Sequence, residues 1–115
     1  MDFKTSETED DSIVIIKLPD RVSADGADDL KGYIKQIVEK GKYKLVINLE
    51  DTNFIDSAGL GAIVSKISVT RANHGDVRMA CAHDYITNLM ELTHLDQIIK
   101  IYNSVKEAVE SYREE

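Results

Sequence analysis

The sequence contains one cysteine, one proline and no tryptophan in 115 residues. A single cysteine, Cys81, cannot form an internal disulfide, so we expect a reduced chain in the cytoplasm. The longest aliphatic run covers residues 13–16, far fewer than the ~20 apolar residues of a membrane span. Basic residues number 14 against 21 acidic ones. The resulting net charge of −7 opposes binding to nucleic acid or to an anionic membrane surface.

What the sequence does contain is typical of a small globular domain. Hydrophobic residues make up 43% of the chain and charged residues 30%, and the apolar residues are spread along its whole length. A compact domain of this size buries roughly two-thirds of its unfolded surface, so a core can form without disulfides. We predict one domain over residues 1–115.

Runs of β-branched and apolar residues alternate with segments of helical period. Two early runs, separated by Glu9, Asp10 and Asp11, predict an antiparallel hairpin. The predicted strands cover residues 3–7, 12–18, 43–49, 77–81 and 98–102. The predicted helices cover residues 25–40, ended by Gly41, and 57–73, followed by a short helix capped by Asp84 and a terminal helix capped by Ser104.

Strands that alternate with helices of this length imply right-handed crossovers and parallel pairing. We therefore predict an α/β fold: a mixed, mostly parallel sheet of four to five strands, with an N-terminal antiparallel hairpin and about four helices.

The junction between the central strand and the second helix has the most informative sequence. Asp56 and Ser57 are both good N-cap residues, and a helix uses one of them. Gly59 and Gly61 fall in the first turns, where each costs about 1 kcal/mol relative to alanine. Such a cost indicates a need for bare backbone, either to pack on the sheet or to let another molecule approach.

Several catalytic and cofactor motifs fail at this junction. A nucleophile elbow needs glycine where Ile55 stands. The third glycine of a dinucleotide fingerprint would fall at Val64, and the Gly-Lys-Ser/Thr of a P-loop is absent. The histidines His74, His83 and His94 are spaced too widely for a local metal motif. We therefore predict no cofactor and no metal, and no catalytic motif is complete at this junction.

The segment Asp56-Ser57-Ala58-Gly59-Leu60-Gly61, preceded by Phe54-Ile55 and a Leu-Val-Ile-Asn-Leu strand, resembles the signature of bacterial anti-sigma factor antagonists of the STAS-domain family. The resemblance covers almost the whole chain, because the order of elements, Thr93-His94-Leu95 and Ser104-Val105 also agree.

The resemblance implies a binding protein rather than an enzyme. Its unphosphorylated form would bind an anti-sigma factor that is itself a serine kinase, and so free the sigma factor. The kinase would phosphorylate Ser57 and thereby end binding, and a serine phosphatase would reset the protein. The implied partner-binding residues are Asp56, Ala58, Gly59, Leu60, Gly61, Asn53, Arg21, Ser23 and Asp25.

One stretch departs from the family pattern. Where the family often has Gly-Glu-Leu-Asp before the first helix, this chain has Asp20-Arg21-Val22-Ser23. Ser23 stands where the family has its acidic residue. Asp25 would have to supply the missing carboxylate.

Two other functions remain open from the residues alone. One is a small serine-dependent enzyme, such as a hydrolase or a nucleotide-dependent transferase, built on Ser57. The other is a scaffold domain that does not switch and whose motif is only structural.

Overall fold

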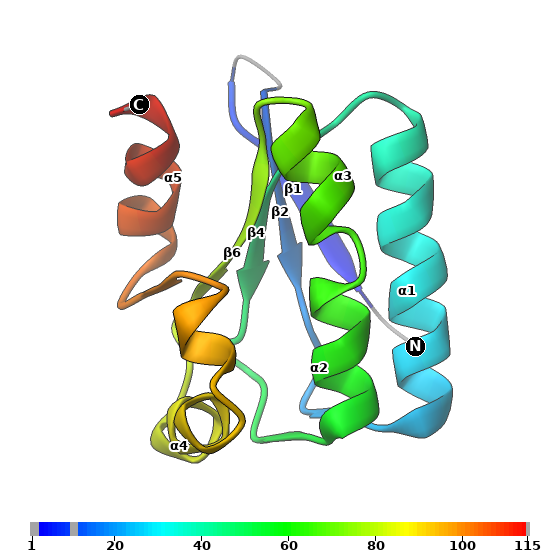
Figure 1. Cartoon of the computed structure of the whole chain (residues 1–115), viewed down its shortest axis with the longest axis vertical. Coiled ribbons are helices and arrows are strands. Elements are labelled where there is room, and N and C mark those ends of the chain that lie inside the picture. The colour runs from blue at the N-terminus through cyan, green and yellow to red at the C-terminus, as the bar shows by residue number, and fades with distance from the viewer. Residues whose placement is uncertain (1–2, 10–11, 115) are drawn as a thin grey trace.

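The structure, a computed structural model, describes residues 3–9 and 12–114, and its centre is a five-stranded sheet (Figure 1). The strands lie in the order β1-β2-β4-β6-β7; β1 is antiparallel to β2, and all other neighbours are parallel. Their bounds are β1 Lys4–Glu7, β2 Ile13–Lys17, β4 Lys44–Asn48, β6 Asp76–Ala80 and β7 Ile101–Tyr102. The predicted fold class is confirmed. The predicted hairpin is present, but Asp10 and Asp11 of its turn lie outside the described residues.

The helices divide between the two faces of this sheet. Three cover one face, α5 covers part of the other, and α4 closes one end (Figure 1). Their bounds are α1 Ala24–Glu39, α2 Ser57–Val64, α3 Ile67–Ala72, α4 Asp84–Leu92 and α5 Val105–Arg113. Gly41, at a left-handed φ of 83°, follows the end of α1, as predicted. No helix of the described residues is both long and apolar enough to cross a bilayer.

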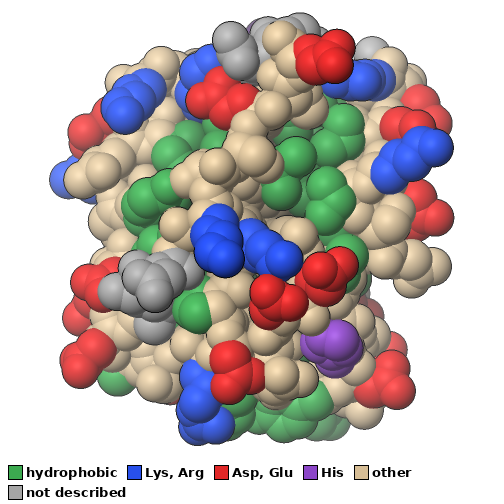
Figure 2. All heavy atoms as spheres, turned by 180° about the vertical axis from the view of Figure 1, so that it is seen from behind, with side chains coloured by type: hydrophobic (Ala, Val, Ile, Leu, Met, Phe, Trp, Pro, Cys, Tyr) green, Lys and Arg blue, Asp and Glu red, His purple; other side chains and the backbone are tan. Residues whose placement is uncertain are grey.

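The alternation of side chains along the strands builds two cores. Val14 and Ile16 of β2 face the layer of α1 and α2, together with Leu45 and Ile47 of β4. Alternate residues such as Ile13 and Val46 face α5 and pack on its Ala108 and Tyr112. Figure 2 shows this second side of the molecule, where hydrophobic side chains remain visible among charged ones. Helix α5 therefore covers this face only in part.

The predicted second helix is two helices in the structure. Ser65 donates its hydroxyl to the Ala62 carbonyl (2.7 Å), and its amide donates to the same carbonyl. Lys66 then leaves helical geometry, with φ −114° and ψ 15°. A serine that bonds back to its own helix competes with the regular ladder, and this competition is not visible in apolar spacing.

Three smaller elements also differ from the prediction. The N-cap of α4 is His83 rather than Asp84, which is the first helical residue. The last strand is limited to Ile101–Tyr102, because Leu95–Gln97 forms a 3-10 turn. Two further strands, β3 Arg21–Val22 and β5 Phe54–Ile55, form a separate two-stranded sheet that was not predicted.

A buried ionic cluster fixes α5 to the sheet. The Asp76 carboxylate accepts from Arg71 Nε (2.9 Å) and from Arg78 Nε (3.1 Å). Arg78 also donates to Ser111 Oγ (2.7 Å), and its guanidinium lies 4.0 Å from the centre of the Tyr112 ring. Asp76 is 5% exposed and Arg78 2% exposed, so their ion pair is buried between α5 and the sheet.

We expect Asp76→Ala to lower the free energy of unfolding by about 3–5 kcal/mol, because it removes the buried carboxylate that accepts from both Arg71 and Arg78. Urea unfolding followed by circular dichroism measures the loss. The matched control is Glu39→Ala, which removes an exposed carboxylate 3.9 Å from Lys35 Nζ and should cost less than about 0.5 kcal/mol. Equal losses in the two variants would contradict this account.

Candidate functional site

The predicted site lies at the end of the molecule where α1, α2 and α4 begin, the lower end in Figure 1. Strand β5 runs parallel to β3, with Arg21 opposite Phe54 and Val22 opposite Ile55. Val22 and Ile55 point inward and are fully buried. Arg21 and Phe54 are the outward residues of this small sheet.

Hydrogen bonds hold the chain that leads into the site. The Asp20 carbonyl accepts from the amides of Asn53 (2.9 Å) and Phe54 (3.1 Å). The Asn53 side chain donates to Asp20 Oδ1 (2.7 Å), and Thr52 donates to the Pro19 carbonyl (2.9 Å). Asn53, predicted as a partner-binding residue, thus has its amide group engaged within the chain and positions the loop.

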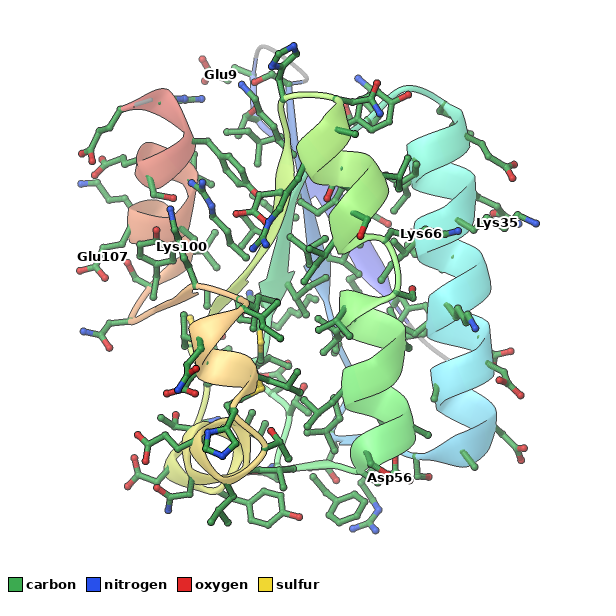
Figure 3. The ribbon with its side chains drawn as sticks, in the orientation of Figure 1. Glu9, Lys35, Asp56, Lys66, Lys100 and Glu107 are labelled. Atoms are coloured by element: carbon green, nitrogen blue, oxygen red, sulfur yellow. The ribbon has the colours of Figure 1, made fainter. Side chains whose placement is uncertain are left out.

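The two candidate caps have separate roles. Asp56 is the N-cap of α2, and its Oδ1 accepts from the Gly59 amide (2.9 Å). Ser57 is the first helical residue and is exposed, and its hydroxyl has no hydrogen-bond partner among the described residues. Asp56 lies at the very start of α2 in Figure 3. The Ser57 hydroxyl is therefore accessible, and it makes no hydrogen bond that stabilises the described part of the fold.

The two glycines of the motif differ in how closely other side chains pack against them. A Cβ on Gly59 would lie 2.5 Å from Ile55 Cγ1 and 3.1 Å from Val22 Cγ1, so the bare backbone there is required by packing on β3 and β5. A Cβ on Gly61 would meet nothing within 4 Å, and this residue is exposed. Packing within the described part of the chain therefore does not explain the cost of Gly61, and its predicted role in partner binding stays a prediction.

The remaining predicted residues are partly at the surface. Ala58 is exposed beside Ser57, whereas the Leu60 side chain is only 2% exposed and supports the surface from beneath. Ser23 is the N-cap of α1 without a side-chain cap bond, and Asp25 lies exposed in the first turn. Helices α1 and α2 pack side by side, so these two residues and Ser57 lie at the same end.

Sequence reasoning named Arg21 as a partner-binding residue but missed the two aromatic side chains that lie beside it, Phe54 and Tyr85. The Arg21 guanidinium lies 4.4 Å from the centre of the Phe54 ring. The Phe54 ring in turn stacks on Tyr85 of α4, with centroids 6.1 Å apart and an interplanar angle of 22°. The only sequence signal was an aromatic residue at the outward position of a two-residue strand, and that strand was not predicted.

Charges near the other strand ends pair with one another. Lys17 Nζ lies 3.3 Å from Asp51 Oδ2 and 3.5 Å from Glu50 Oε1. Its hydrogen bond to Asp51 raises the pKa of the lysine above its usual value. The pair is exposed and therefore contributes little to stability. His83 Nε2 contacts the Glu50 carbonyl oxygen (2.7 Å), which fixes the ring in place.

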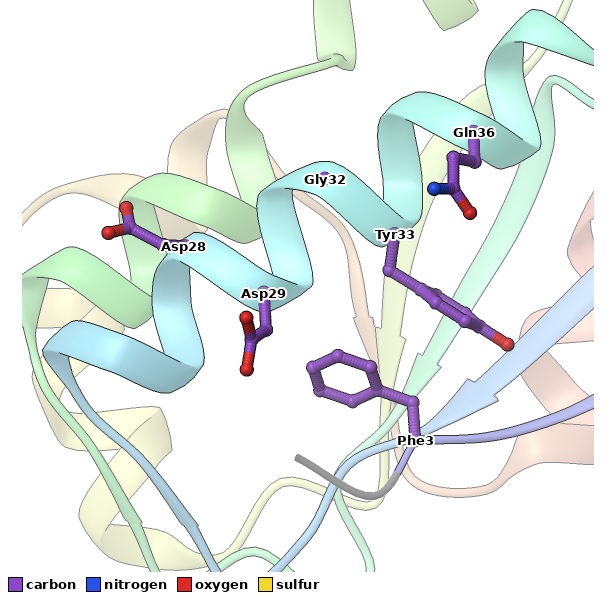
Figure 4. A pocket seen from close by; sticks show the side chains of 6 residues that line it. All are labelled: Phe3, Asp28, Asp29, Gly32, Tyr33 and Gln36. Carbon is purple, nitrogen blue, oxygen red and sulfur yellow. The ribbon is translucent and has the colours of Figure 1, made fainter.

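Three further features bear on catalytic chemistry: the Cys81 thiol, the grouping of metal-ligand side chains and the hollow beside α1. Burial raises the pKa of the Cys81 thiol, so it stays mostly protonated near neutral pH and is a poor nucleophile. Among the described residues, no three His, Cys, Asp or Glu side chains gather as metal ligands. A hollow of about 490 Å³ lies between β1 and α1 and is not lined by Ser57 (Figure 4). Its lining residues are Phe3, Asp28, Asp29, Gly32, Tyr33 and Gln36.

Comparison with known families identifies the domain. Residues 5–108 match the STAS domain family. The chain belongs to this family. A Thermotoga maritima protein that carries the provisional name anti-sigma factor antagonist is 29% identical over 104 residues, which are 90% of this chain and 92% of the relative. Its crystal structure superimposes with a TM-score of 0.86 over 96% of this chain and 94% of the other.

Two more distant STAS relatives complete the comparison. The anti-sigma-B factor antagonist of Staphylococcus aureus is 22% identical over 88% of this chain and 94% of its own. The anti-sigma factor antagonist SpoIIAA, solved in its unphosphorylated form, has a TM-score of 0.76 at 16% identity, covering 97% of this chain and 98% of that one. At this identity the SpoIIAA structure shows the shared fold.

We expect opposite effects of alanine at the two motif glycines. Gly59→Ala should destabilise the protein by about 1–2 kcal/mol, since overpacking against Ile55 exceeds the gain in helix propensity. Gly61→Ala, where a Cβ meets nothing, should stabilise it by up to about 1 kcal/mol. Thermal and urea unfolding measure both. Stabilisation by Gly59→Ala would show that the close contact with β3 and β5 has been misjudged.

The cap assignment makes a second prediction. Asp56→Ala should lower the free energy of unfolding by about 1 kcal/mol, because it leaves the Gly59 amide without its side-chain acceptor. Ser57→Ala removes a hydroxyl that bonds to no described residue and should change stability by less than about 0.5 kcal/mol. Urea unfolding of the two variants in parallel measures both changes. A larger loss of unfolding free energy in Ser57→Ala than in Asp56→Ala would show that Ser57, not Asp56, caps α2.

Proposed function

We propose that this protein is an anti-sigma factor antagonist whose binding is switched off by phosphorylation of Ser57. The observation that carries the proposal is the free, exposed Ser57 hydroxyl beside an N-cap supplied by Asp56. The names of the STAS relatives support the same function. The partner is an anti-sigma factor with serine kinase activity, and a serine phosphatase returns the protein to its binding form.

A phosphate on Ser57 is compatible with the fold. It adds about −1.5 to −2 charges at neutral pH, and negative charge at the start of a helix is favoured by about 0.3–1 kcal/mol. The Asp56–Gly59 hydrogen bond does not involve the Ser57 hydroxyl, so esterification removes no cap. We therefore expect the modified protein to stay folded.

The same phosphate opposes binding. It adds bulk and charge beside Asp56, on a surface where Ala58 and Gly61 leave room for close approach. A partner packed on this surface would have to remove the water around a doubly charged ester, which is costly without a compensating cation. A loss of about 3 kcal/mol would weaken binding more than a hundredfold.

The test begins with the partner. Immobilised wild-type protein and Ser57→Asp are exposed to a lysate of the source organism with and without ATP. The anti-sigma factor that is retained by wild type alone, and released by ATP, is then purified. We expect it to add one phosphate to wild type and none to Ser57→Ala by intact-mass analysis, and we expect Ser57→Asp to bind it at least about a hundredfold more weakly by calorimetry.

The matched control is Ser68→Asp, the same substitution at an exposed serine of α3, which should bind like wild type. Efficient phosphorylation of Ser57→Ala would refute Ser57 as the acceptor. Equal affinity of wild type and Ser57→Asp would favour a scaffold that does not switch. Turnover of a small substrate that is lost in Ser57→Ala would favour the enzyme.

A further inference from the structure

A row of three stacked side chains lies beside the Ser57 surface. Arg21 of β3 and Phe54 of β5 are register partners and lie outward, with the guanidinium 4.4 Å from the ring centre. Tyr85, in the first turn of α4, extends the row by stacking on Phe54 at 6.1 Å. We call Arg21, Phe54 and Tyr85 the aromatic row.

The aromatic row is partly open to solvent: Arg21 and Tyr85 are exposed, and Phe54 is half-buried. Tyr85 is 50% exposed and is one of four exposed large hydrophobic side chains among the described residues. Its hydroxyl has no hydrogen-bond partner in the described part of the chain. Aromatic side chains offer large rigid contact area and are enriched where binding energy concentrates, so this exposure favours a binding role.

Arg21 has a charge available for a partner. It makes no ion pair with any described carboxylate, whereas Arg71 and Arg78 both contact Asp76. Its acidic neighbours are engaged elsewhere, because Asp56 accepts from Gly59 and Asp20 accepts from Asn53. Stacking on Phe54 holds the guanidinium in place and leaves its edge N–H groups free for a carboxylate.

The aromatic row and Ser57 belong to one continuous surface. Phe54 precedes the Asp56 N-cap by two residues, and Val22 and Ile55 beneath the row are the same side chains that contact Gly59 of α2. Helix α4 packs against β5, and its Tyr85 stacks on the Phe54 ring. A partner that reaches Ser57 therefore meets the row on the same approach.

We propose that the aromatic row is the specificity-determining half of the docking surface, and that it takes a protein partner presenting an apolar side chain flanked by a carboxylate. The apolar side chain packs on Tyr85 and Phe54, and the carboxylate pairs with Arg21. This proposal rests on the proposed function, since the occupant is the anti-sigma factor that binds the Ser57 surface.

The proposed pair between Arg21 and a partner carboxylate also explains how a phosphate on Ser57 would weaken binding. A carboxylate held by Arg21 in the complex would lie on the surface that receives the doubly negative ester. Repulsion between like charges at an interface lowers affinity strongly when both are desolvated. The aromatic row thus selects the partner and makes its binding sensitive to the charge on Ser57.

Calorimetry with the purified anti-sigma factor tests the row. We expect Tyr85→Ala to weaken binding about tenfold and Arg21→Gln about tenfold. Arg21→Glu should weaken it about a hundredfold or more, because a carboxylate then faces a carboxylate. The controls are Lys106→Glu, an exposed charge reversal on α5, and Leu92→Ala, an apolar truncation at the other end of α4. Both should bind within about twofold of wild type. Circular dichroism checks that each variant is folded.

The outcomes separate the two proposals. Row variants that bind within twofold of wild type, while Ser57→Asp has lost binding, overturn the aromatic row and leave the phosphorylation switch standing. Weakened row variants with a Ser57→Asp that binds like wild type support the row and overturn the switch. Equal losses of affinity in Arg21→Gln and Arg21→Glu refute a partner carboxylate at Arg21. Control variants that lose as much affinity as the row variants refute the assignment of specificity to the aromatic row.

Discussion

The site depends on one hydrogen bond, from the Gly59 amide to the Asp56 carboxylate. Two adjacent residues were able to cap α2, and the structure uses the carboxylate of Asp56 rather than the hydroxyl of Ser57. Had Ser57 been the cap, its hydroxyl would have been tied to a backbone amide, and modifying it would have removed a stabilising contact. With Asp56 as the cap, the modification that we propose at Ser57 would leave the cap hydrogen bond in place.

The cap in turn depends on the small sheet of β3 and β5. Val22 and Ile55 are fully buried, and they press so closely on Gly59 that no side chain fits there. Asp20 holds both strands through the Asn53 and Phe54 amides. The start of α2 is therefore positioned from below by packing and from the side by backbone hydrogen bonds. If this is the docking surface, as we propose, it needs little ordering when a partner binds, and this lowers the entropic cost of binding.

The sequence predicted the larger elements because their signals are periodic. Apolar residues at helical spacing, such as Leu30 and Ile34, predicted α1. Runs of β-branched residues predicted β2 and β4. It did not predict β3 and β5, since two residues are too few to show a period, nor the break at Ser65, which arises from a side-chain hydrogen bond. At the site, spacing alone left Asp56 and Ser57 equivalent. Only coordinates separate a cap from a free hydroxyl, and only they bring Tyr85 from α4 onto Phe54.

The position of the ionic cluster explains why a strong local charge need not disturb the fold. Asp76 and Arg78 occupy the start and middle of β6, whereas α2 begins at the end of the sheet where the strands finish. From Asp76 to the end of this five-residue strand the chain rises about 13 Å. Because Coulomb interactions weaken with distance, the phosphate that we propose at Ser57 would act more weakly on Asp76 than on a partner packed directly against α2. We therefore expect its main effect at the surface around Ser57.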